Sequence, residues 1–275
     1  MKLSIITINL NNAKGLRKTI ESVVSQTFTD YEYIVIDGAS TDGSVDIIKE
    51  FADKITYWIS ESDNGIYNAM NKGILKANGE YCLFLNSGDW LVDQNVIFDF
   101  VNCEYNEDVI SGNVLLFDNS NYILYQSPQK DALNFLYFYR GSIPHPASFI
   151  KRDLFTHFGF YNETNKIVSD MEFFVKVLVL NNCSYNHLDR NISCFNLDGI
   201  SSQKGWNDLH EKEAEGVYQS AMSPLIYKAF KQLIAENLLF KTSEVEFREY
   251  MNLKKGKFAF LIKLTLWIKA LLKKR

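Results

Sequence analysis

Apolar runs and helical stripes alternate along the first ninety residues of the chain. Continuous β-prone apolar runs predict strands that are buried on both faces, at Leu3–Ile8, Tyr33–Ile36, Ile55–Ile59 and Tyr81–Leu85. Apolar residues at helical spacing between these runs predict helices at Leu16–Ser25, Val45–Phe51 and Ile66–Ala77. Ser44 is the expected N-cap of the second helix, and Asn78-Gly79 is the expected end of the third. This alternation predicts right-handed β-α-β crossovers and a mostly parallel, doubly wound sheet.

The second part of the chain has a less regular pattern. Val109–Phe117 and Tyr122–Gln126 predict an antiparallel pair of strands around a turn. Phe149–Phe155 indicates a strand that leads into a helix, and Glu172–Leu180 is typical of a helix. From Asp208 onward the pattern is helical. Two short runs predict edge strands, at Ser184–Asn186 and Ile192–Asn196.

Composition indicates a globular protein with reduced thiols. The chain has 275 residues, of which 47% are hydrophobic and only 4 are proline, so a sizeable core is possible and intrinsic disorder is excluded. This length allows one large α/β domain or two small domains. The four cysteines are widely separated and form no C-x-x-C pair, which argues against a zinc ribbon or a dense disulfide framework.

Charge is distributed unequally along the chain. Eight basic residues and no acid lie in residues 250–275, which leaves 21 basic and 33 acidic side chains in residues 1–249, a formal charge of −12. An acidic body argues against nucleic-acid binding, because phosphate neutralisation requires a basic face. No signal peptide or membrane-spanning apolar stretch is evident, so we expect a protein that stays in the cytoplasm and at most contacts a membrane surface.

Polar residues follow each of the four predicted parallel strands. The four clusters are Asn9 with Asn11 and Asn12, Asp37 to Gly43, Glu61 with Asp63 and Asn64, and Asn86 to Asp89. Ligands of open α/β sheets bind beyond the carboxyl ends of the strands, where helix N-termini suit phosphate groups. Each cluster alone is typical of a turn. Four clusters at consecutive strand ends together predict a nucleotide pocket.

The predicted pocket lacks the glycine motifs of two common nucleotide sites. The first strand–helix turn, Asn9–Gly15, has a single glycine, so it is not the G-x-G-x-x-G of a dinucleotide site, and no Walker A sequence is present. The phosphates must be neutralised in another way. A divalent metal held by few protein carboxylates is the natural candidate.

Four segments together resemble the family 2 glycosyltransferases of the GT-A fold. These segments are Leu3–Gly15, Asp37–Gly43, Asp63–Gly73 and Phe84–Trp90, and the likeness covers roughly residues 1–205. The resemblance implies an α/β GT-A nucleotide-diphospho-sugar transferase fold, with a Rossmann-like, mostly parallel central sheet and helices on both faces. It implies a domain at 1–205, with a nucleotide-sugar-binding half at 1–100 and an acceptor half at 101–205, followed by a helical C-terminal extension at 206–275.

The resemblance also implies the residues that bind the donor. Asn86–Asp89 stands where the family has its metal-binding D-x-D sequence, and Asp89 is the remaining carboxylate, so it is the expected ligand of Mg²⁺ or Mn²⁺. Met70 stands where many relatives place an arginine that touches the base. Two diphosphate oxygens and waters could complete an octahedral metal site around one carboxylate. The full expected donor set is Thr7, Asn9, Asp37, Asp63, Met70, Asn71, Asn86, Ser87, Gly88 and Asp89.

The acceptor half contains the expected base. Asp170, in the segment Ile167–Phe174, precedes an apolar helical run, where an acid is often only a helix cap. The segment resembles the family's E-D-x-E/D motif, in which the aspartate is the catalytic base, so Asp170 is the predicted base and Glu172 comes second. His145, in a proline-flanked loop, is expected on the acceptor or diphosphate side. Residues 198–201 resemble a G-G-I-S loop that closes over the site, with Gly199 and Ser201 as its mobile positions.

Together these features predict a metal-dependent, inverting glycosyltransferase. Its donor would be a nucleotide sugar, most often a UDP-sugar, and its acceptor a saccharide or polyprenyl-linked saccharide in bacterial capsule, exopolysaccharide or lipopolysaccharide synthesis. Two alternatives are a sugar nucleotidyltransferase and a non-catalytic nucleotide-sugar-binding protein.

The basic tail is expected to bind a membrane surface if the acceptor is lipid-linked. Apolar residues and lysines in 256–275 suit an anionic membrane surface. The alternative for the tail is a helix packed on the domain.

Overall fold

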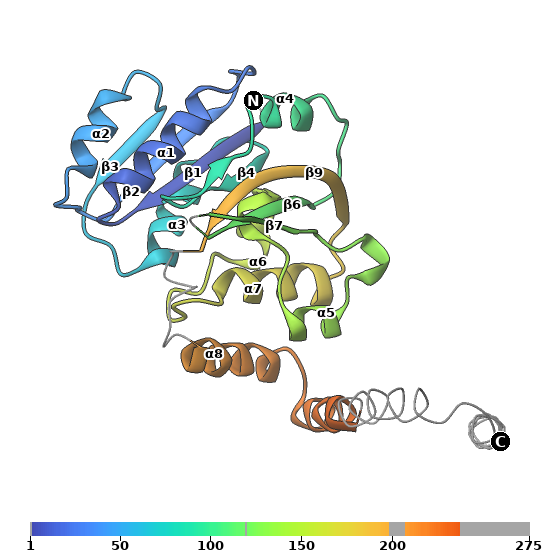
Figure 1. Ribbon diagram of the computed structural model, residues 1–275. Helices are drawn as coiled ribbons and strands as arrows, with labels where there is room; N and C mark the ends of the chain where they lie inside the picture. Colours follow the sequence, from blue (N-terminus) through green and yellow to red (C-terminus); the bar gives the residue numbers. More distant parts are fainter. Residues whose placement is uncertain (1, 119, 198–206, 237–275) are drawn as a thin grey trace, which may run out of the picture. The chain divides into compact units, whose positions relative to one another are not determined.

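Four strands from the first ninety residues run parallel in the computed structural model of the chain (Figure 1). They are β1 (Leu3–Asn9), β2 (Glu32–Asp37), β3 (Tyr57–Ser60) and β4 (Tyr81–Phe84). β1 lies between β2 and β4, so that Ile5 is opposite both Tyr33 and Leu83. Every residue of β1, β2 and β4 is buried, as their apolar runs predict.

The helices that connect these strands are confirmed, with small shifts at their ends. They are α1 (Ala13–Val24), α2 (Ser44–Glu50) and α3 (Ile66–Lys76). Ser44 is the first residue of α2 and not its N-cap, because Gly43 occupies that position. The cap hydrogen bond comes instead from Asp42, whose Oδ1 accepts from the backbone N–H of Ser44 at 3.1 Å.

The second half of the sheet mixes parallel and antiparallel pairs. Its strands are β5 (Trp90–Leu91), β6 (Val109–Phe117), β7 (Tyr122–Tyr125), β8 (Ser148–Lys151) and β9 (Tyr185–Asn196), and the order is β3-β2-β1-β4-β8-β6-β9-β5, with β7 on β6. β8 is antiparallel to both β4 and β6. The first three helices that follow β4 are short: α4 (Val96–Val101), α5 (Phe135–Arg140) and α6 (Asp153–Phe158) have 6 residues each. Parallel crossovers need longer connections, so the predicted parallel sheet is confined mainly to the first half.

The two predicted edge strands at Ser184–Asn186 and Ile192–Asn196 are wrong. They form the single strand β9, which lies between β6 and β5 inside the sheet. The polar residues in its middle concealed the strand, because they bond to distant side chains. Arg190, for example, forms ion pairs with Asp93 and Asp99 at 2.8 and 2.9 Å.

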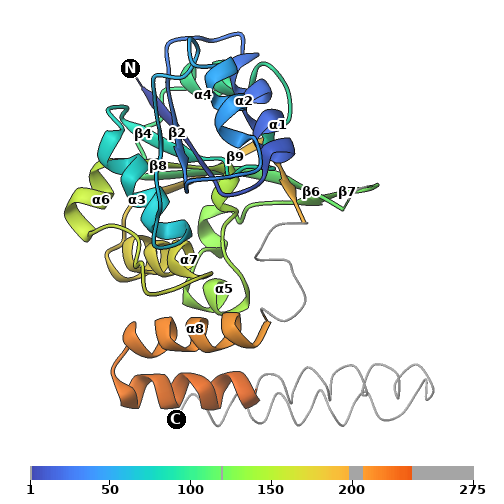
Figure 2. The ribbon, with the colours of Figure 1, turned by 90° about the vertical axis from the view of Figure 1, so that its left-hand side faces the viewer.

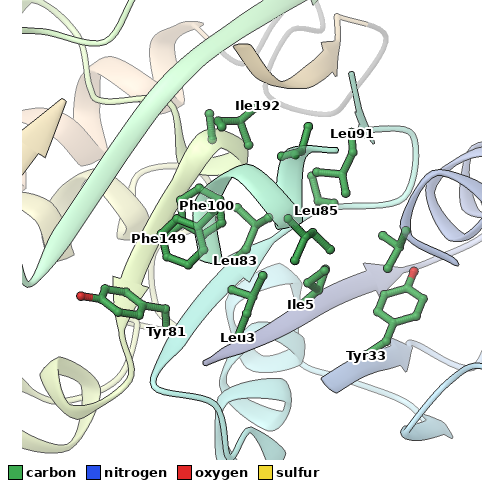
Figure 3. Close-up of a cluster of buried hydrophobic side chains, with 14 of the residues drawn as sticks. Leu3, Ile5, Tyr33, Tyr81, Leu83, Leu85, Leu91, Phe100, Phe149 and Ile192 are labelled. Carbon is green, nitrogen blue, oxygen red and sulfur yellow. The ribbon is translucent and has the colours of Figure 1, made fainter. Parts of the chain in front are cut away.

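Two apolar layers cover the faces of the sheet. Leu3, Ile5, Leu83 and Leu85 lie in the main cluster (Figure 3), which also contains residues of α1, α2 and α4. The rings of Phe100 and Phe149 stack in it, with centroids 3.7 Å apart. The opposite face carries α3, α6 and α7 (Ser169–Phe174), as Figure 1 and Figure 2 show. Burial on both faces leaves only the carboxyl ends of the strands open for polar chemistry.

The remaining helical segments lie toward the C-terminus or in short turns. They are the 3₁₀ turns η1 (Lys130–Ala132) and η2 (His145–Ala147), the π-helical turn η3 (Val175–Leu180), α8 (Asn207–Ser220) and a helix at 224–236. The helical pattern expected after Asp208 is therefore confirmed as far as residue 236. α8 packs on α5, where the hydroxyl of Tyr218 donates to the carbonyl of Phe138 at 3.1 Å.

The structure describes residues 2–118, 120–197 and 207–236 and divides into two units, Met1–Ala221 and Met222–Arg275. α8 belongs to the first unit, whereas the sequence suggested a domain boundary at 205/206. Gly199, Ser201 and the basic segment 256–275 lie outside the described residues. Among the described helices, none is long and apolar enough to cross a membrane.

Candidate active site

The carboxyl ends of three parallel strands bring their last polar residues into one row. Asn9 of β1 is opposite Asp37 of β2, and Asp37 is opposite Ser60 of β3. The amide of Asn9 donates to Asp37 Oδ1 at 2.7 Å and to Ser40 Oγ at 3.1 Å. The predicted clusters after the first, second and third strands therefore meet.

Asp37 is fully buried and its carboxylate is surrounded by donors. Besides Asn9, it accepts from the Ser40 hydroxyl at 2.6 Å, the Ser40 backbone N–H at 2.9 Å and the Ser60 hydroxyl at 2.6 Å. Burial alone would raise the pKa of Asp37, but the hydrogen bonds from Ser40, Ser60 and Asn9 outweigh burial and hold that pKa below its ordinary value. The carboxylate thus organises the loop after β2, and its acceptor positions are occupied by the protein.

The loop after β2 approaches the loop after β3 closely. A Cβ on Gly38 would lie 2.5 Å from Asp63 Oδ2, so a larger residue here would displace the Asp63 side chain. Ala39, the next residue, has a φ of 62°, a left-handed conformation that is costly for alanine. Asp63 is half-buried, and its Oδ1 accepts from the Gly65 N–H at 2.9 Å at the start of α3. Asp63 Oδ2 therefore lies at the junction of two strand ends.

Thr7 and Met70, both expected at the donor, lie in the interior. Thr7 is fully buried in β1, and its hydroxyl is 3.1 Å from that of Tyr33. Met70 of α3 is 2% exposed. Both side chains pack in the interior next to the strand ends and are not exposed at the open edge.

The segment Asn86–Asp89 is tied to β1 and α1. The backbone N–H of Ser87 donates to the carbonyl of Ile8 at 3.0 Å. The Thr19 hydroxyl accepts from the Gly88 N–H at 3.0 Å and donates to the Asp89 carbonyl at 2.6 Å. Gly88 has a φ of 109°, which favours glycine. Sequence reasoning missed Thr19, which stands in the middle of a helix and shows no local signal.

Asp89 is the buried carboxylate of this segment. It is 4% exposed, and its Oδ1 accepts from the backbone N–H of Asn196 on β9 at 3.1 Å. Burial raises the pKa of Asp89 to about 7, and backbone N–H groups of Asn196 and Asn86 oppose the rise. Within residues 2–118, 120–197 and 207–236, no Lys or Arg side chain forms an ion pair with Asp89.

Two further oxygens near the strand ends have no hydrogen-bond partner in the described part of the chain. They are Oδ1 of Asn9 and Oδ1 of Asn86, and both are buried. Buried polar atoms are nearly always paired, so these two oxygens are candidate acceptors for a donor group or a cation. In the described ranges, no group of three His, Cys, Asp or Glu side chains forms a protein-only metal centre. Asp89 and Asn86 together offer hard oxygen donors for a divalent ion that a ligand would complete.

Asp170 lies on the α3 side of the sheet, in the first turn of α7. Val168 is the N-cap of this helix, so Asp170 is not the cap. Its Oδ1 accepts a hydrogen bond of 2.9 Å from the hydroxyl of Tyr67, a residue of α3 that is 5% exposed. Tyr67 is 103 positions away in sequence. The predicted motif after the third strand therefore contacts the predicted base.

Asn71, expected at the donor, holds the backbone before α7 instead. Its amide donates to the Tyr161 carbonyl and to Glu163 Oε1, both at 2.9 Å, and its Oδ1 accepts from the Tyr161 N–H at 3.1 Å. These bonds use both amide hydrogens and the oxygen of a side chain that is 7% exposed. Asn71 therefore joins α3 to the chain that leads to Asp170.

His145 is buried beside the same wall. Its Nε2 is hydrogen-bonded to the Tyr161 hydroxyl at 2.8 Å, and its ring stacks on Phe84 with centroids 4.8 Å apart. Burial lowers the pKa of His145, and the nearby Asp170 opposes this effect. A neutral imidazole is therefore favoured near neutral pH.

Glu172 and Glu213 stabilise the loop that precedes Asp170. The Glu172 carboxylate accepts from the amides of Asn162 and Asn165 at 3.1 and 2.7 Å. Glu213 of α8 accepts from the backbone N–H groups of Lys166 and Ile167 at 2.8 and 3.0 Å. The two acids hold this loop from opposite ends. Sequence reasoning missed Glu213, because α8 was assigned to a separate extension.

The chain matches known glycosyltransferases in sequence. The model of the family described as glycosyl transferase family 2 matches residues 4–159. A PGL/p-HBAD biosynthesis glycosyltransferase of Mycobacterium tuberculosis is 31% identical over 179 residues, which are 63% of this chain and 68% of the relative. Glycosyltransferase GlyA of Streptococcus pneumoniae is 31% identical over 128 residues, 45% of this chain and 18% of the relative.

Solved structures share the fold. S. aureus TarS 1–349 in complex with UDP-GlcNAc has a TM-score of 0.65 and 22% identity, and the match covers 80% of this chain and 65% of TarS 1–349. The mannosyltransferase PcManGT from Pyrobaculum calidifontis, in complex with GDP-Man and Mn²⁺, has a TM-score of 0.61 and 14% identity, over 98% of this chain and 80% of that protein. These likenesses confirm the predicted GT-A fold.

The hydrogen bonds to Asp37 predict a pH-dependent loss of stability in Asp37→Asn. The native carboxylate has a lowered pKa, so its contribution is complete above the ordinary value of about 4 and is lost as the pH falls through the native pKa. We expect Asp37→Asn to lower the free energy of unfolding by about 1.5–3 kcal/mol at pH 7. The difference from wild type should shrink toward pH 3 in urea-unfolding measurements.

Asp46→Asn is the control, because the side chain of Asp46 is 86% exposed. It should change the unfolding midpoint little at either pH. A deficit of Asp37→Asn that stayed constant between pH 7 and pH 3 would contradict the assigned role of the charge.

Proposed function

Because the chain belongs to glycosyl transferase family 2, we propose that it transfers a sugar from a nucleotide-sugar donor to a saccharide or lipid-linked saccharide in cell-surface polysaccharide synthesis. The observation that carries this proposal is that α3 links two groups of residues, because Asp63 at its start lies against the loop after β2 and Tyr67 in its first turn bonds to Asp170. The strand-end oxygens of Asn9, Asn86 and Asp89 suit a donor, and Asp170 suits an acceptor. The names of relatives support it, since TarS binds UDP-GlcNAc and PcManGT binds GDP-Man. A UDP-sugar is the proposed donor.

Asp170 is the proposed general base. Its carboxylate takes the proton of an acceptor hydroxyl, and the acceptor oxygen forms a bond to the anomeric carbon of the donor sugar. The bond between that carbon and the phosphate oxygen breaks, and its electron pair leaves with the nucleoside diphosphate. A single displacement of this kind inverts the anomeric configuration.

The proposed donor contacts divide into two groups. Asp63, Asn86, Ser87 and Gly88 lie at the open ends of the strands and would contact the nucleotide sugar directly. Thr7, Asp37, Met70 and Asn71 would support the site through buried contacts, and the remaining two members, Asn9 and Asp89, offer buried oxygens. His145 and Glu172 would serve the acceptor side by orienting the wall and the loop beside Asp170. Gly199 and Ser201 remain proposed closing positions.

Asp89 is the proposed protein ligand of Mg²⁺ or Mn²⁺, with Asn86 Oδ1 as a second oxygen. The residues fit a divalent ion, because Asp89 is a buried carboxylate without a cationic partner in the described part of the chain, and Asn86 of the same segment has an unpaired amide oxygen. A divalent ion held by Asp89 would neutralise the charge that develops on the diphosphate. Asn196 holds Asp89 Oδ1 through its backbone N–H.

The basic C-terminal segment is the proposed membrane contact. Residues 250–275 carry eight basic residues and no acid, together with many apolar side chains. In the second unit, Leu225, Ile226 and Leu233 of the helix at 224–236 are 81%, 61% and 58% exposed. Exposed apolar residues and lysines suit an anionic lipid surface, and the protein would act at that surface on a lipid-linked acceptor.

Asp170→Asn should abolish transfer and leave donor binding nearly unchanged, because the base acts only on the acceptor. The expected loss is about 10²- to 10⁴-fold in the rate of nucleoside diphosphate release with acceptor present. A screen of UDP- and GDP-sugars with candidate saccharide acceptors gives the assay, and calorimetry gives donor affinity. Asp99→Asn, which alters a carboxylate that bonds to Arg190 on the other face, should keep wild-type turnover. Full turnover in Asp170→Asn would remove Asp170 from the mechanism.

Metal removal should weaken both turnover and nucleotide binding. EDTA should lower diphosphate release, and added Mn²⁺ or Mg²⁺ should restore it, because the ion neutralises the donor phosphates. Calorimetry of UDP with and without Mn²⁺ provides a readout that is independent of catalysis, and Asp89→Asn should lose the dependence on Mn²⁺. Activity and UDP affinity that are both insensitive to EDTA would reject the assignment of Asp89.

Deletion of residues 256–275 should release the protein from anionic vesicles without loss of donor binding. The removed segment supplies six of the basic residues of the tail, each worth roughly 1 kcal/mol near an anionic surface. Co-sedimentation with phosphatidylserine vesicles measures the change, and neutral phosphatidylcholine vesicles are the control. Equal sedimentation before and after the deletion would show that the segment does not bind the membrane.

A further inference from the structure

One face of α3 makes hydrogen bonds to the chain that carries the proposed base. Tyr67, Asn68 and Asn71 stand one and three positions apart along α3 and all reach the segment from Tyr161 to Asp170. Asn68 donates to Glu163 Oε2 at 2.9 Å, and Asn71 holds the other oxygen of the same carboxylate. The chain that precedes Asp170 is therefore held by α3 at Tyr161 and Glu163, and Tyr67 contacts the Asp170 carboxylate itself.

We propose that Tyr67 is a positioning residue for transfer, which holds Oδ1 of Asp170 and leaves Oδ2 as the atom that receives the acceptor's proton. This inference rests on the proposed role of Asp170 as the base. The sequence motif Asp63–Gly73 contains Tyr67 but gives it no role, and this inference assigns one. It also explains why a segment next to the donor loop is needed for chemistry on the acceptor.

The geometry favours a fixed carboxylate over a freely rotating one. The terminal torsion of an aspartate is broad and roughly two-fold, so its two oxygens exchange readily unless one of them is held. The Tyr67 hydroxyl is 2.9 Å from Oδ1, and the Tyr67 side chain is 5% exposed, so its ring has little room to move. Among the residues that the structure describes, none forms a hydrogen bond to Oδ2, which leaves that oxygen for the acceptor.

Tyr67 acts as a donor and not as a second base. Burial, reinforced by the charge of Asp170, holds the pKa of Tyr67 well above its ordinary value. The phenol therefore keeps its proton throughout the working range. The nearby His145 cannot replace it in this arrangement, because His145 Nε2 is bonded to the Tyr161 hydroxyl at 2.8 Å.

The test compares Tyr67→Phe with Tyr81→Phe in the full-length protein. Tyr81 is a buried tyrosine at the amino-terminal end of β4. Its hydroxyl donates to the Glu107 carbonyl at 2.8 Å. Each variant loses one buried hydroxyl bond, so both should lose similar stability in thermal unfolding. In Tyr67→Phe we expect kcat to fall by about 10- to 100-fold, while the KM of the donor changes less than two-fold. In Tyr81→Phe both constants should stay near wild type.

Two outcomes would overturn the proposal. One is a kcat in Tyr67→Phe within two-fold of wild type, and the other is an equal fall in Tyr81→Phe. A double variant tests the route of the effect. Since Tyr67 acts through Asp170, adding Tyr67→Phe to Asp170→Asn should lower the residual turnover no further, and an additive loss would contradict this route.

Comparison of Asp170→Asn with Tyr67→Phe separates the proposed base from the proposed positioning residue. If Asp170→Asn retains transfer, the assignment of the base is wrong. If Asp170→Asn is inactive and Tyr67→Phe keeps its kcat, the base assignment stands and only the positioning role of Tyr67 is wrong. Donor affinity measured by calorimetry should be unchanged in both variants, because neither side chain is proposed to contact the nucleotide.

Discussion

The parallel register of β1 with β2 and β4 is the constraint on which the site depends. It is fixed by the apolar side chains of these strands, which are buried on both faces of the sheet. A shift of one residue would turn Asn9 and Asp37 to the opposite face and remove their mutual hydrogen bond. With the register fixed, the strands end together, and polar residues that are far apart in sequence meet at one edge.

The acceptor side is built against the other face of the sheet. Phe84 stacks on His145 and also contacts Tyr161, so the same strand that leads to Asn86 supports the wall near Asp170. α3 joins this wall to the donor loops, because Asp63 precedes it and Tyr67 lies in its first turn. One helix thus links the proposed donor loop to the proposed base. In the proposed reaction, that link would hold Asp170 in position toward a sugar bound at the strand ends.

The sequence predicted the elements with a clear period and the polar strand ends, because both are local signals. It extended the parallel sheet further than the structure does. It also divided β9 into two strands, because Arg190 and its neighbours acquire their ion-pair partners only after folding. It identified Asn71 as part of a motif, but its contact with Tyr161 spans 90 positions and has no local signature. Thr19 and Glu213 escaped notice for the same reason.

The stereochemistry of the product tests the central claim most directly. Proton NMR of the newly formed linkage, with the donor identified by the nucleotide-sugar screen, gives the anomeric configuration relative to the donor sugar. A single displacement with Asp170 as the base predicts inversion. Retention of configuration would contradict the account, because it requires either a second displacement or attack from the face of the leaving group.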